Sequence, residues 1–360
     1  MALVSDRLSH ENGGIHESVF GLARELDRGT TGEFASFGFC RDGELEDRWD
    51  GLQVFPLSAE EHWFPISRTL ARAVEEWKPD VIHLHGLWGI ATRSLGTFPS
   101  SCPHLLSPHG MLQPWAMNRS AFKKRVSWQL WERALSTGGA FHALNLAEKN
   151  ALEERGIYEP IHVVPNGVAL PNRKPLEERE KVILFFSRLH PMKGLGALIE
   201  GWARIASDFP DWRVDVAGWE EGGYGRECEI LAKRLGLSRQ IRFVGPKFGP
   251  EKADCLASVA GLAQPSLNEG LPMSILEAWS YGTPTLMSDH CHLPEGFQRG
   301  AAIKINPTSE SVAEGLRRFL SLGELDRGNM GAAGRTLVEE RFRWGEVGQR
   351  FLEIYEEMAG

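Results

Sequence analysis

The segment Ala263–Asp289, AQPSLNEGLPMSILEAWSYGTPTLMSD, contains the pattern from which the rest of the chain is best interpreted. A short apolar strand is expected to end near its beginning, and a polar loop follows. Proline is favoured in the first turn of a helix, so Pro272 predicts where a helix starts. Gly282 and Pro284 are expected to end it, because glycine favours the turn after a helix and proline cannot continue one. The segment therefore predicts a strand, a loop, a helix and a second strand, as in an α/β fold.

Two carboxylates flank the start of this helix. Glu269 lies in the loop before it, and Glu277 lies about one and a half turns inside it. The first backbone N–H groups, near Met273 and Ser274, have no acceptor within the helix and point toward the space between the carboxylates. Such a site suits a molecule with an anionic end and a polyhydroxyl end. The alternative is that Glu269 caps the helix and Glu277 is a solvated helix residue.

Strand-like and helix-like segments alternate on both sides of a polar, proline-rich stretch that begins at Pro171. A parallel sheet covered by helices produces this alternation, so we predict two α/β domains, residues 1–170 and 171–343, facing each other. The apolar residues at the start of the chain predict a short first strand, Ala2–Ser5. The last segment, about 344–360, has the spacing of an amphipathic helix.

Composition excludes several classes of protein. The 360 residues contain no run of about 18 apolar residues, which a membrane-spanning helix needs. The formal charge of −8 argues against a nucleic-acid partner, because binding phosphates requires a basic face. Five scattered cysteines without a C-x-x-C pair, and a start without a signal-peptide pattern, predict a reducing, cytoplasmic location. The sequence His290-Cys291-His292 is not expected to bind a metal, because adjacent residues on one loop seldom complete a coordination sphere.

Two cations lie five residues apart after a buried strand. Arg188 and Lys193 form the pattern S-R-L-x-x-x-K-G at a strand-to-helix turn. Two positive charges at the carboxyl end of a strand suit a diphosphate, and they could replace a divalent metal in neutralising a leaving diphosphate. No convincing D-x-D metal motif occurs in the chain, which agrees. The alternative is a surface ion pair for Arg188 and a solvated loop charge for Lys193.

Histidines and glycines mark the ends of the predicted strands in the first half of the chain. The strand VIHLHG carries His83 and His85 on one face, and the next strand delivers His109 to a loop. Ligands of doubly wound sheets lie outside the carboxyl ends of the strands, so His85 and His109 are expected to face that crevice. Gly13-Gly14 precedes the first helix, where two glycines allow a ligand to approach the backbone closely, although a simple flexible turn is the alternative.

A basic segment with tryptophans, NRSAFKKRVSWQLWERAL, covers residues 118–135. Arg119, Lys123, Lys124 and Arg125 lie close in sequence to three tryptophans, which are Trp115, Trp128 and Trp131. One interpretation is an ordinary surface helix with buried aromatic side chains. The other is an acceptor-side or membrane-surface patch for a lipid-linked substrate.

The pattern E-x7-E around a Gly-Leu-Pro turn, followed by a helix, Gly-x-Pro and a strand, resembles the donor-site signature of family 4 glycosyltransferases. Further motifs that resemble this family cover nearly the whole chain: Gly13-Gly14, SPHG at 107–110, VPNGV at 164–168, the Arg–Lys pair, Gly218 and FVG at 243–245. The resemblance implies the GT-B architecture, two Rossmann-like domains across a cleft with the last helix crossing back to the first domain. It also implies transfer of a sugar from a UDP- or GDP-sugar with retention of configuration and without a metal or other cofactor.

The resemblance assigns roles to individual residues. Glu277 is expected to hold the donor ribose, and Glu269 the donor sugar and phosphates. Arg188 and Lys193 would bind the diphosphate, and His109 would lie near the reacting carbon. The acceptor implied is a glycan or a lipid-linked saccharide in the synthesis of cell-surface polysaccharide, with peripheral membrane contact through the basic helix as an option.

The remaining donor-site positions implied by the resemblance are mostly backbone groups. Gly14 would line the donor phosphate or the acceptor edge, and the loops at Gly218 and Gly245 would frame the base. The amides after Glu269 would bind the donor, at Gly270, Leu271, Met273 and Ser274. One departure is Ala169, which stands after N-G-V where the family commonly has aspartate.

Three other functions use similar residues. A nucleotide-sugar epimerase would need acid and base groups at the anomeric and neighbouring carbons, and a phosphorylase would need a lysine that holds pyridoxal phosphate. A sugar-binding module would not need to stabilise a departing diphosphate, so the two cations together with the two glutamates argue against it.

Overall fold

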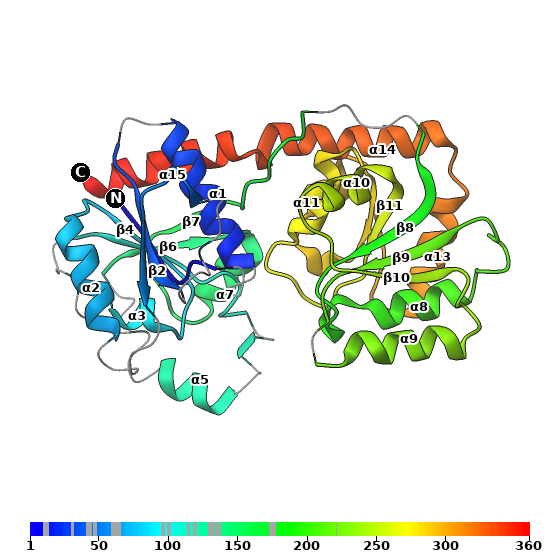
Figure 1. Cartoon of the computed structure of the whole chain (residues 1–360), viewed down its shortest axis with the longest axis horizontal. Helices are drawn as coiled ribbons and strands as arrows, with labels where there is room; N and C mark the ends of the chain where they lie inside the picture. The colour runs from blue at the N-terminus through cyan, green and yellow to red at the C-terminus, as the bar shows by residue number, and fades with distance from the viewer. Residues whose placement is uncertain are drawn as a thin grey trace. The chain divides into compact units, whose positions relative to one another are not determined.

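The computed structural model describes residues 1–9, 14–29, 32–40, 45, 49–58, 66–94, 98, 102–113, 116–117, 121–128, 133, 138–172, 178–220 and 222–360 (Figure 1). Contacts between Cα atoms divide the chain into two compact units. Unit 1 contains Met1–Gly167 and Trp344–Gly360, and unit 2 contains Val168–Arg343. The chain therefore passes from unit 1 to unit 2 and returns to unit 1 with its last helix.

Unit 1 is built on a seven-stranded sheet in the order β3-β2-β1-β4-β5-β6-β7. Every neighbouring pair of its strands is parallel. The strands are β1 (Ala2–Arg7), β2 (Ala35–Cys40), β3 (Val54–Ser58), β4 (Ile82–His85), β5 (His104–Ser107), β6 (Ala140–Ala143) and β7 (Ile161–Val163). The order reverses at β1, whose two neighbours are β2 and β4, as in a doubly wound sheet.

The expectation of a short first strand was wrong. Strand β1 has six residues and continues through the polar Ser5 to Arg7. It is buried up to Ser5, because parallel strands on both sides and helices on both faces enclose it. Polar residues at the carboxyl end of a central strand remain in the ladder because the neighbouring strands supply their hydrogen bonds.

Helices cover both faces of this sheet. Within the described residues, the helices of unit 1 are α1 (Gly14–Gly29), α2 (Ile66–Trp77), α3 (Ile90–Ser94), α5 (Ala121–Ser127), α7 (Leu146–Glu153) and the terminal α15 (Trp344–Ala359). Helix α5 contributes no described residue to the apolar clusters of this unit. Residues of α1 and α15 share one apolar cluster, and residues of α2, α3 and α7 share the other (Figure 1). Helix α15 buries Val347, Phe351, Ile354 and Tyr355 in unit 1, as the amphipathic pattern of the last segment predicts.

The start of α15 is fixed by two glycines of the same unit. A Cβ atom on Gly21 would lie 2.1 Å from Trp344 Cζ2, and one on Gly167 would lie 2.4 Å from Trp344 Cδ2. The indole therefore lies against bare backbone on both sides, where any larger residue would displace it.

Unit 2 has a six-stranded parallel sheet in the order β10-β9-β8-β11-β12-β13. Its strands are β8 (Glu180–Phe186), β9 (Arg213–Ala217), β10 (Ile241–Gly245), β11 (Val259–Gln264), β12 (Thr285–Met287) and β13 (Ala302–Lys304). Its helical elements are η5 (Pro191–Lys193), α8 (Leu195–Ala203), α9 (Tyr224–Arg234), α10 (Gly249–Ser258), α11 (Met273–Ser280), η6 (Asp289–Cys291), α12 (Pro294–Gln298), α13 (Ser309–Leu320), α14 (Glu324–Leu337) and η7 (Val338–Phe342).

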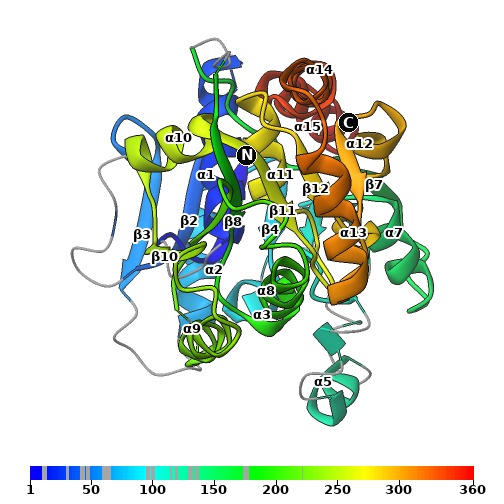
Figure 2. The same cartoon turned by 90° about the vertical axis from the view of Figure 1, so that its right-hand side faces the viewer.

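Two apolar clusters lie on opposite faces of this second sheet. Helices α8, α9 and α13 contribute to one, and α10, α11 and α14 contribute to the other (Figure 2). Both units are thus Rossmann-like α/β folds with helices on both faces of a parallel sheet, in agreement with the alternation of strands and helices along the sequence.

Candidate functional site

Helix α11 begins and ends close to where the sequence predicts. Pro272 is its N-cap, and Gly282, with φ of 67°, follows its C-cap. The N–H groups of Met273 and Ser274 occupy the first two helical positions, where no intrahelical acceptor exists. Gly270 and Leu271 lead into the helix, and Leu271 packs against the apolar cluster on this face of the sheet. The N-terminus of α11, which carries the partial positive charge of the helix dipole, therefore directly follows the loop that contains Glu269.

Glu269 is the centre of a buried hydrogen-bond network. Its side chain is 6% exposed, and Oε1 accepts hydrogen bonds from Gln264 Nε2 at 2.8 Å and Ser266 Oγ at 2.7 Å. Oε2 accepts from Lys193 Nζ at 2.6 Å. The hydroxyl of Ser274 donates to Gln264 Oε1 at 2.6 Å, which extends the network to the first turn of α11. None of these contacts is a bond to a helix N–H, so they do not support the simple capping interpretation of Glu269.

The loop of Lys193 is locked against the loop of Glu269. Leu267 N donates to Met192 O at 2.8 Å. Gly194 has φ of 75°, and a Cβ atom there would lie 1.9 Å from the carbonyl oxygen of Pro265. The Lys193 side chain is 17% exposed, so it is not a solvated loop charge. The fold thus brings one of the two predicted cations into contact with one of the two predicted carboxylates.

Glu277 is paired with a lysine that sequence reasoning missed. Lys252 Nζ lies 2.5 Å from Glu277 Oε1, and the two side chains are 31% and 20% exposed. The same ammonium lies 5.8 Å from the ring centroid of Phe186, at the end of β8. Lys252 is in α10, and only the packing of α10 beside α11 places it there. No motif around it in the sequence could have indicated this contact.

Three other predicted donor-site residues lie at the carboxyl ends of strands β8, β9 and β10. Arg188 is half-buried and follows β8. Gly218 N donates to Gly245 O at 3.1 Å, so these two loops are joined. A Cβ atom on Gly218 would lie 1.8 Å from the carbonyl oxygen of Ser187, which requires glycine at this position.

Arg179 holds the other end of helix α11 and was also missed. Its guanidinium donates to the carbonyl oxygens of Tyr281 at 2.8 Å and Gly282 at 3.0 Å, and to Thr283 Oγ1 at 2.5 Å. It also donates to the carbonyl oxygen of Ala257 at 3.0 Å, at the end of α10. Burial lowers the pKa of Arg179 to about 10. This residue satisfies carbonyl groups that a helix end leaves unpaired, and it joins the helices that carry Lys252 and Glu277.

In unit 1 the structure brings His85 and His109 together. The hydrogen bond between His85 Nδ1 and His109 Nε2 is 3.0 Å long. His109 has φ of 51°, a left-handed conformation that is uncommon for a residue with a side chain, and Gly110 follows with φ of 78°. Burial, and to a lesser extent His142, lower the pKa of His109 to about 3, so the ring is neutral at pH 7.

A directional hydrogen-bond chain crosses the middle of unit 1. His142 Nε2 lies 2.7 Å from Val164 O, and because a carbonyl only accepts, this nitrogen carries the proton. Ser107 Oγ then donates to His142 Nδ1 at 2.6 Å and accepts from His83 Nε2 at 2.6 Å. His83 Nδ1 is left to accept from the Tyr355 hydroxyl at 2.7 Å. The Val164 carbonyl thus sets the tautomers of both buried histidines, and the Tyr355 hydroxyl of α15 completes the chain. Burial lowers the pKa of each histidine and keeps it neutral.

Other predictions for unit 1 are covered only in part. Gly14 is the first residue of α1, whereas Gly13 lies outside the described residues. Of the basic segment, α5, Trp128 and Arg133 are described. Trp128 is buried, as an ordinary surface helix would require, but Phe122 is 81% exposed beside the lysines. Arg119, Trp115 and Trp131 lie outside the described residues.

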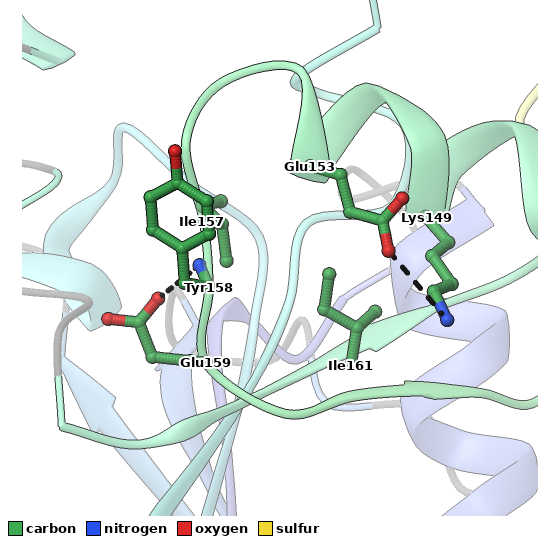
Figure 3. A pocket seen from close by; sticks show the side chains of 6 residues that line it. All are labelled: Lys149, Glu153, Ile157, Tyr158, Glu159 and Ile161. Carbon is green, nitrogen blue, oxygen red and sulfur yellow. Dashed lines mark hydrogen bonds and ion pairs between the residues drawn. The ribbon is translucent and has the colours of Figure 1, made fainter.

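Two of the hollows that described residues line lie in unit 1. One of about 430 Å³ lies beside α7 and the edge strand β7, and none of the predicted residues lines it; its lining residues are Lys149, Glu153, Ile157, Tyr158, Glu159 and Ile161 (Figure 3). The other, of about 250 Å³, includes His109 and Gly110 in its wall. Its other lining residues are Leu87, Trp88, Met111, Ala116 and Lys124. The second hollow is therefore the one associated with a predicted site residue.

Family models match nearly the whole chain in two parts. Residues 13–167 match the model described as a glycosyl transferase 4-like domain, and residues 169–336 match the model described as glycosyl transferases group 1. The Anabaena protein HepE, whose crystal structure contains UDP and glucose, is 19% identical with a TM-score of 0.80, over 99% of this chain and 100% of that one. Sucrose-phosphate synthase from Thermosynechococcus elongatus is 16% identical with a TM-score of 0.79, over 99% of each chain. These structural likenesses show the fold, which is GT-B.

Curated relatives are also glycosyltransferases. An uncharacterized glycosyltransferase of Haemophilus influenzae is 24% identical over 280 residues, which are 76% of each chain. The D-inositol 3-phosphate glycosyltransferase of Corynebacterium urealyticum is 29% identical over 49% of this chain and 42% of its own length. The lipopolysaccharide 1,6-galactosyltransferase of Salmonella typhimurium is 30% identical over 41% of this chain and 42% of its own length. The match thus spans less than half of the length of the latter two.

The fold and the matched sequence define a glycosyltransferase of the GT-B class. More particularly, the chain belongs to family 4 of the glycosyltransferases. The matches do not favour the epimerase alternative. In the described part of the chain no helix is long and apolar enough to cross a membrane.

Proposed function

We propose that this enzyme transfers a sugar, with retention of configuration, from a UDP- or GDP-sugar to a hydroxyl of a glycan or lipid-linked acceptor. The observation that carries the proposal is the contact between Lys193 and Glu269 at the start of α11. There a cation, a carboxylate and the positive end of a helix come together, which suits a diphosphate attached to a sugar. The structure of HepE with UDP-glucose supports a nucleotide-sugar donor.

In the proposed mechanism unit 2 binds the donor. Arg188, Lys193 and the N–H groups of Met273 and Ser274 bind the diphosphate, whose charge increases as the glycosidic bond breaks. Oε1 of Glu269 accepts two of the described hydrogen bonds and Oε2 accepts one, so Oε2 keeps a lone pair with which the carboxylate can still accept from a sugar hydroxyl.

The nucleoside is proposed to lie toward the other strand ends of the same sheet. Glu277, held by Lys252, would accept the ribose hydroxyls, and the joined loops of Gly218 and Gly245 would frame the base.

Unit 1 is proposed to bring the acceptor to the reacting carbon. His109, neutral at pH 7, would lie beside the transferred sugar, and Gly14 would line the site at the start of α1. For retention, the acceptor hydroxyl attacks the face that the diphosphate leaves, and a phosphate oxygen takes its proton. Phe122 with Lys123 and Lys124 on α5 would contact an anionic membrane surface if the acceptor is lipid-linked.

The experiment that tests this function is a thermal-shift panel of nucleoside diphosphates and nucleotide sugars, followed by product analysis. A ligand at 100 times its dissociation constant should add about 2.7 kcal/mol of stability. Glu277→Ala should weaken donor binding more than it slows turnover at saturating donor, because ribose contacts are similar in ground and transition states. If neither UDP, GDP nor their sugars stabilise the protein, the proposal is contradicted. If the sugar on the nucleotide is changed in the absence of any acceptor, the protein is an epimerase.

Metal independence is tested separately. We expect activity to persist in excess EDTA, because Arg188 and Lys193 are proposed to neutralise the leaving diphosphate. Loss of activity that only Mg²⁺ or Mn²⁺ restores would show that the cations are insufficient.

A further inference from the structure

Helix α7 carries a buried carboxylate that reaches out of its own helix. Asn145 caps α7, and its Oδ1 accepts from Glu148 N at 2.9 Å. In a capping box the glutamate at this position reaches back to the N–H of the cap residue. Here Glu148, which is 1% exposed, instead accepts from Leu144 N at 2.8 Å and from Gly110 N at 2.5 Å. The second of these contacts joins α7 to the residue that follows His109.

A second tether joins the same turn to the end of α7. Arg155 Nε donates to Leu112 O at 2.8 Å. The turn from His109 to Leu112 is therefore held at two points, an N–H that a carboxylate binds and a carbonyl that a guanidinium binds. Both partners come from α7 or the residues just after it.

His109 needs such support because its backbone is left-handed. A residue with a Cβ atom in this conformation costs free energy relative to an ordinary turn, and it persists only where its surroundings determine it. With Gly110 fixed by Glu148 and the imidazole bonded to His85, both the backbone and the side chain of His109 are constrained. A carboxylate suits this task better than an amide, because a glutamine in its place offers one acceptor to two N–H donors.

Burial opposes the charge of this carboxylate. Desolvation raises the pKa of Glu148, and the hydrogen bonds from Leu144 N and Gly110 N lower it. A purely structural role is the alternative explanation, in which Glu148 only stabilises unit 1. The two explanations differ in whether Glu148 still matters for turnover after the imidazole of His109 is removed.

We propose that Glu148 is a positioning residue for His109, acting through the N–H of Gly110. The inference rests on the proposed function, in which His109 lies by the transferred sugar. It adds that α7 fixes the geometry of the turn that contains His109. It also adds that a substitution of Glu148 lowers kcat by displacing the imidazole of His109.

The test is a double-mutant cycle of Glu148→Gln and His109→Ala. Turnover is measured as nucleoside diphosphate release from UDP-glucose, or from the GDP-sugar that the thermal-shift panel selects, with water as the acceptor. Glu148→Gln should lower kcat at least tenfold at saturating donor and change KM for the donor less than twofold. In the His109→Ala background the same substitution should change kcat less than threefold. Glu153→Gln is the matched control, since Glu153 lies on the same helix with a 52% exposed side chain paired to Lys149, and its kcat should stay within twofold of wild type.

The outcomes separate the two proposals. If His109→Ala lowers kcat and Glu148→Gln lowers it by the same factor in both backgrounds, the positioning role is wrong and the role of His109 stands. If Glu148→Gln alone leaves kcat within twofold of wild type, the positioning role is also wrong. If His109→Ala keeps wild-type kcat, the proposed role of His109 fails and the positioning role with it.

A second variant covers the case in which Glu148→Gln does not fold. Arg155→Gln removes the other tether from a less buried position, and it should lower kcat at least threefold alone and less than twofold beside His109→Ala. If Arg155→Gln lowers kcat by the same factor with and without His109→Ala, the proposal is overturned.

Discussion

Replacing Lys193 by methionine should lower the stability of unit 2 and the rate of transfer by separate mechanisms. Lys193 Nζ lies 2.6 Å from Glu269 Oε2, and the two side chains are 17% and 6% exposed. Removing one partner of a fully buried ion pair costs about 3–5 kcal/mol. Glu269 retains hydrogen bonds from Gln264 and Ser266, so the loss should approach that of one hydrogen bond to a charged group, about 2 kcal/mol.

Thermal unfolding measures the first effect. For a unit of this size a loss of about 2 kcal/mol lowers Tm by roughly 4–8 °C. The matched control is Lys181→Met, because Lys181 pairs with Asp211 at 3.5 Å with side chains that are 58% and 77% exposed. Exposed pairs contribute about 0–1 kcal/mol, so the control should change Tm by at most about 4 °C.

Steady-state kinetics measures the second effect. If Lys193 stabilises the departing diphosphate, its loss should cost about 3–4 kcal/mol in the transition state, or a factor of roughly 10² to 10³ in kcat. The double variant Lys193→Met with Glu269→Gln should recover part of the stability, because no unpaired charge remains buried, while kcat stays low. A single variant with kcat within threefold of wild type at saturating donor would refute the diphosphate role, and an unchanged Tm would refute the stability calculation.

Three further predictions concern groups away from that ion pair. Burial lowers the pKa of His142 from 6.5 to about 4, so between these pH values the unfolded chain binds a proton that the folded chain does not. The stability that the neutral ring contributes is present above pH 6.5 and is lost as the pH falls toward 4. The loss at pH 5 is about 2 kcal/mol. The free energy of unfolding in urea should therefore differ less between pH 8 and pH 5 for His142→Gln than for the wild type. An equal difference in the two proteins would contradict a neutral His142 in the folded state. Lys252→Met should weaken nucleoside diphosphate binding about tenfold by calorimetry, as expected for the loss of about 1.4 kcal/mol, with little change in kcat at saturating donor; wild-type affinity would show that Lys252 does not hold its partner carboxylate in place. Gly21→Ala should destabilise unit 1 by about 1–3 kcal/mol in urea, because its Cβ would overlap the Trp344 ring, whereas Gly29→Ala meets open space and should change little; equal effects of the two would contradict this account.

Local sequence patterns predicted helix α11 closely. Pro272 and Gly282 mark its ends in the structure as in the sequence, because capping depends on residues within one turn of the helix end. The sequence predicted that Lys193 and Glu269 belong to the same site, but it did not predict the contact between them. Each follows a strand of the same parallel sheet, and the carboxyl ends of such strands lie on one side.

Residues that act across the sequence were not predictable in this way. Lys252, Arg179 and Glu148 reach partners 25, about 100 and 38 positions away in sequence, and only the packing of whole elements brings them there. Each appears in the sequence as an ordinary charged residue of a helix or a strand start. A pattern read over one turn or one strand contains no information about such pairs.

The return of the last helix to unit 1 has a consequence for how the chain is made. Synthesis proceeds from the N-terminus, and domains that are continuous in sequence can fold as they emerge. Unit 1 lacks α15, and with it the Tyr355 hydroxyl that begins the hydrogen-bond chain through His83, until all of unit 2 has been synthesised. The half that is synthesised first is therefore the half that is completed last, and a ribosome that stops before Trp344 releases a complete unit 2 joined to an unfinished unit 1.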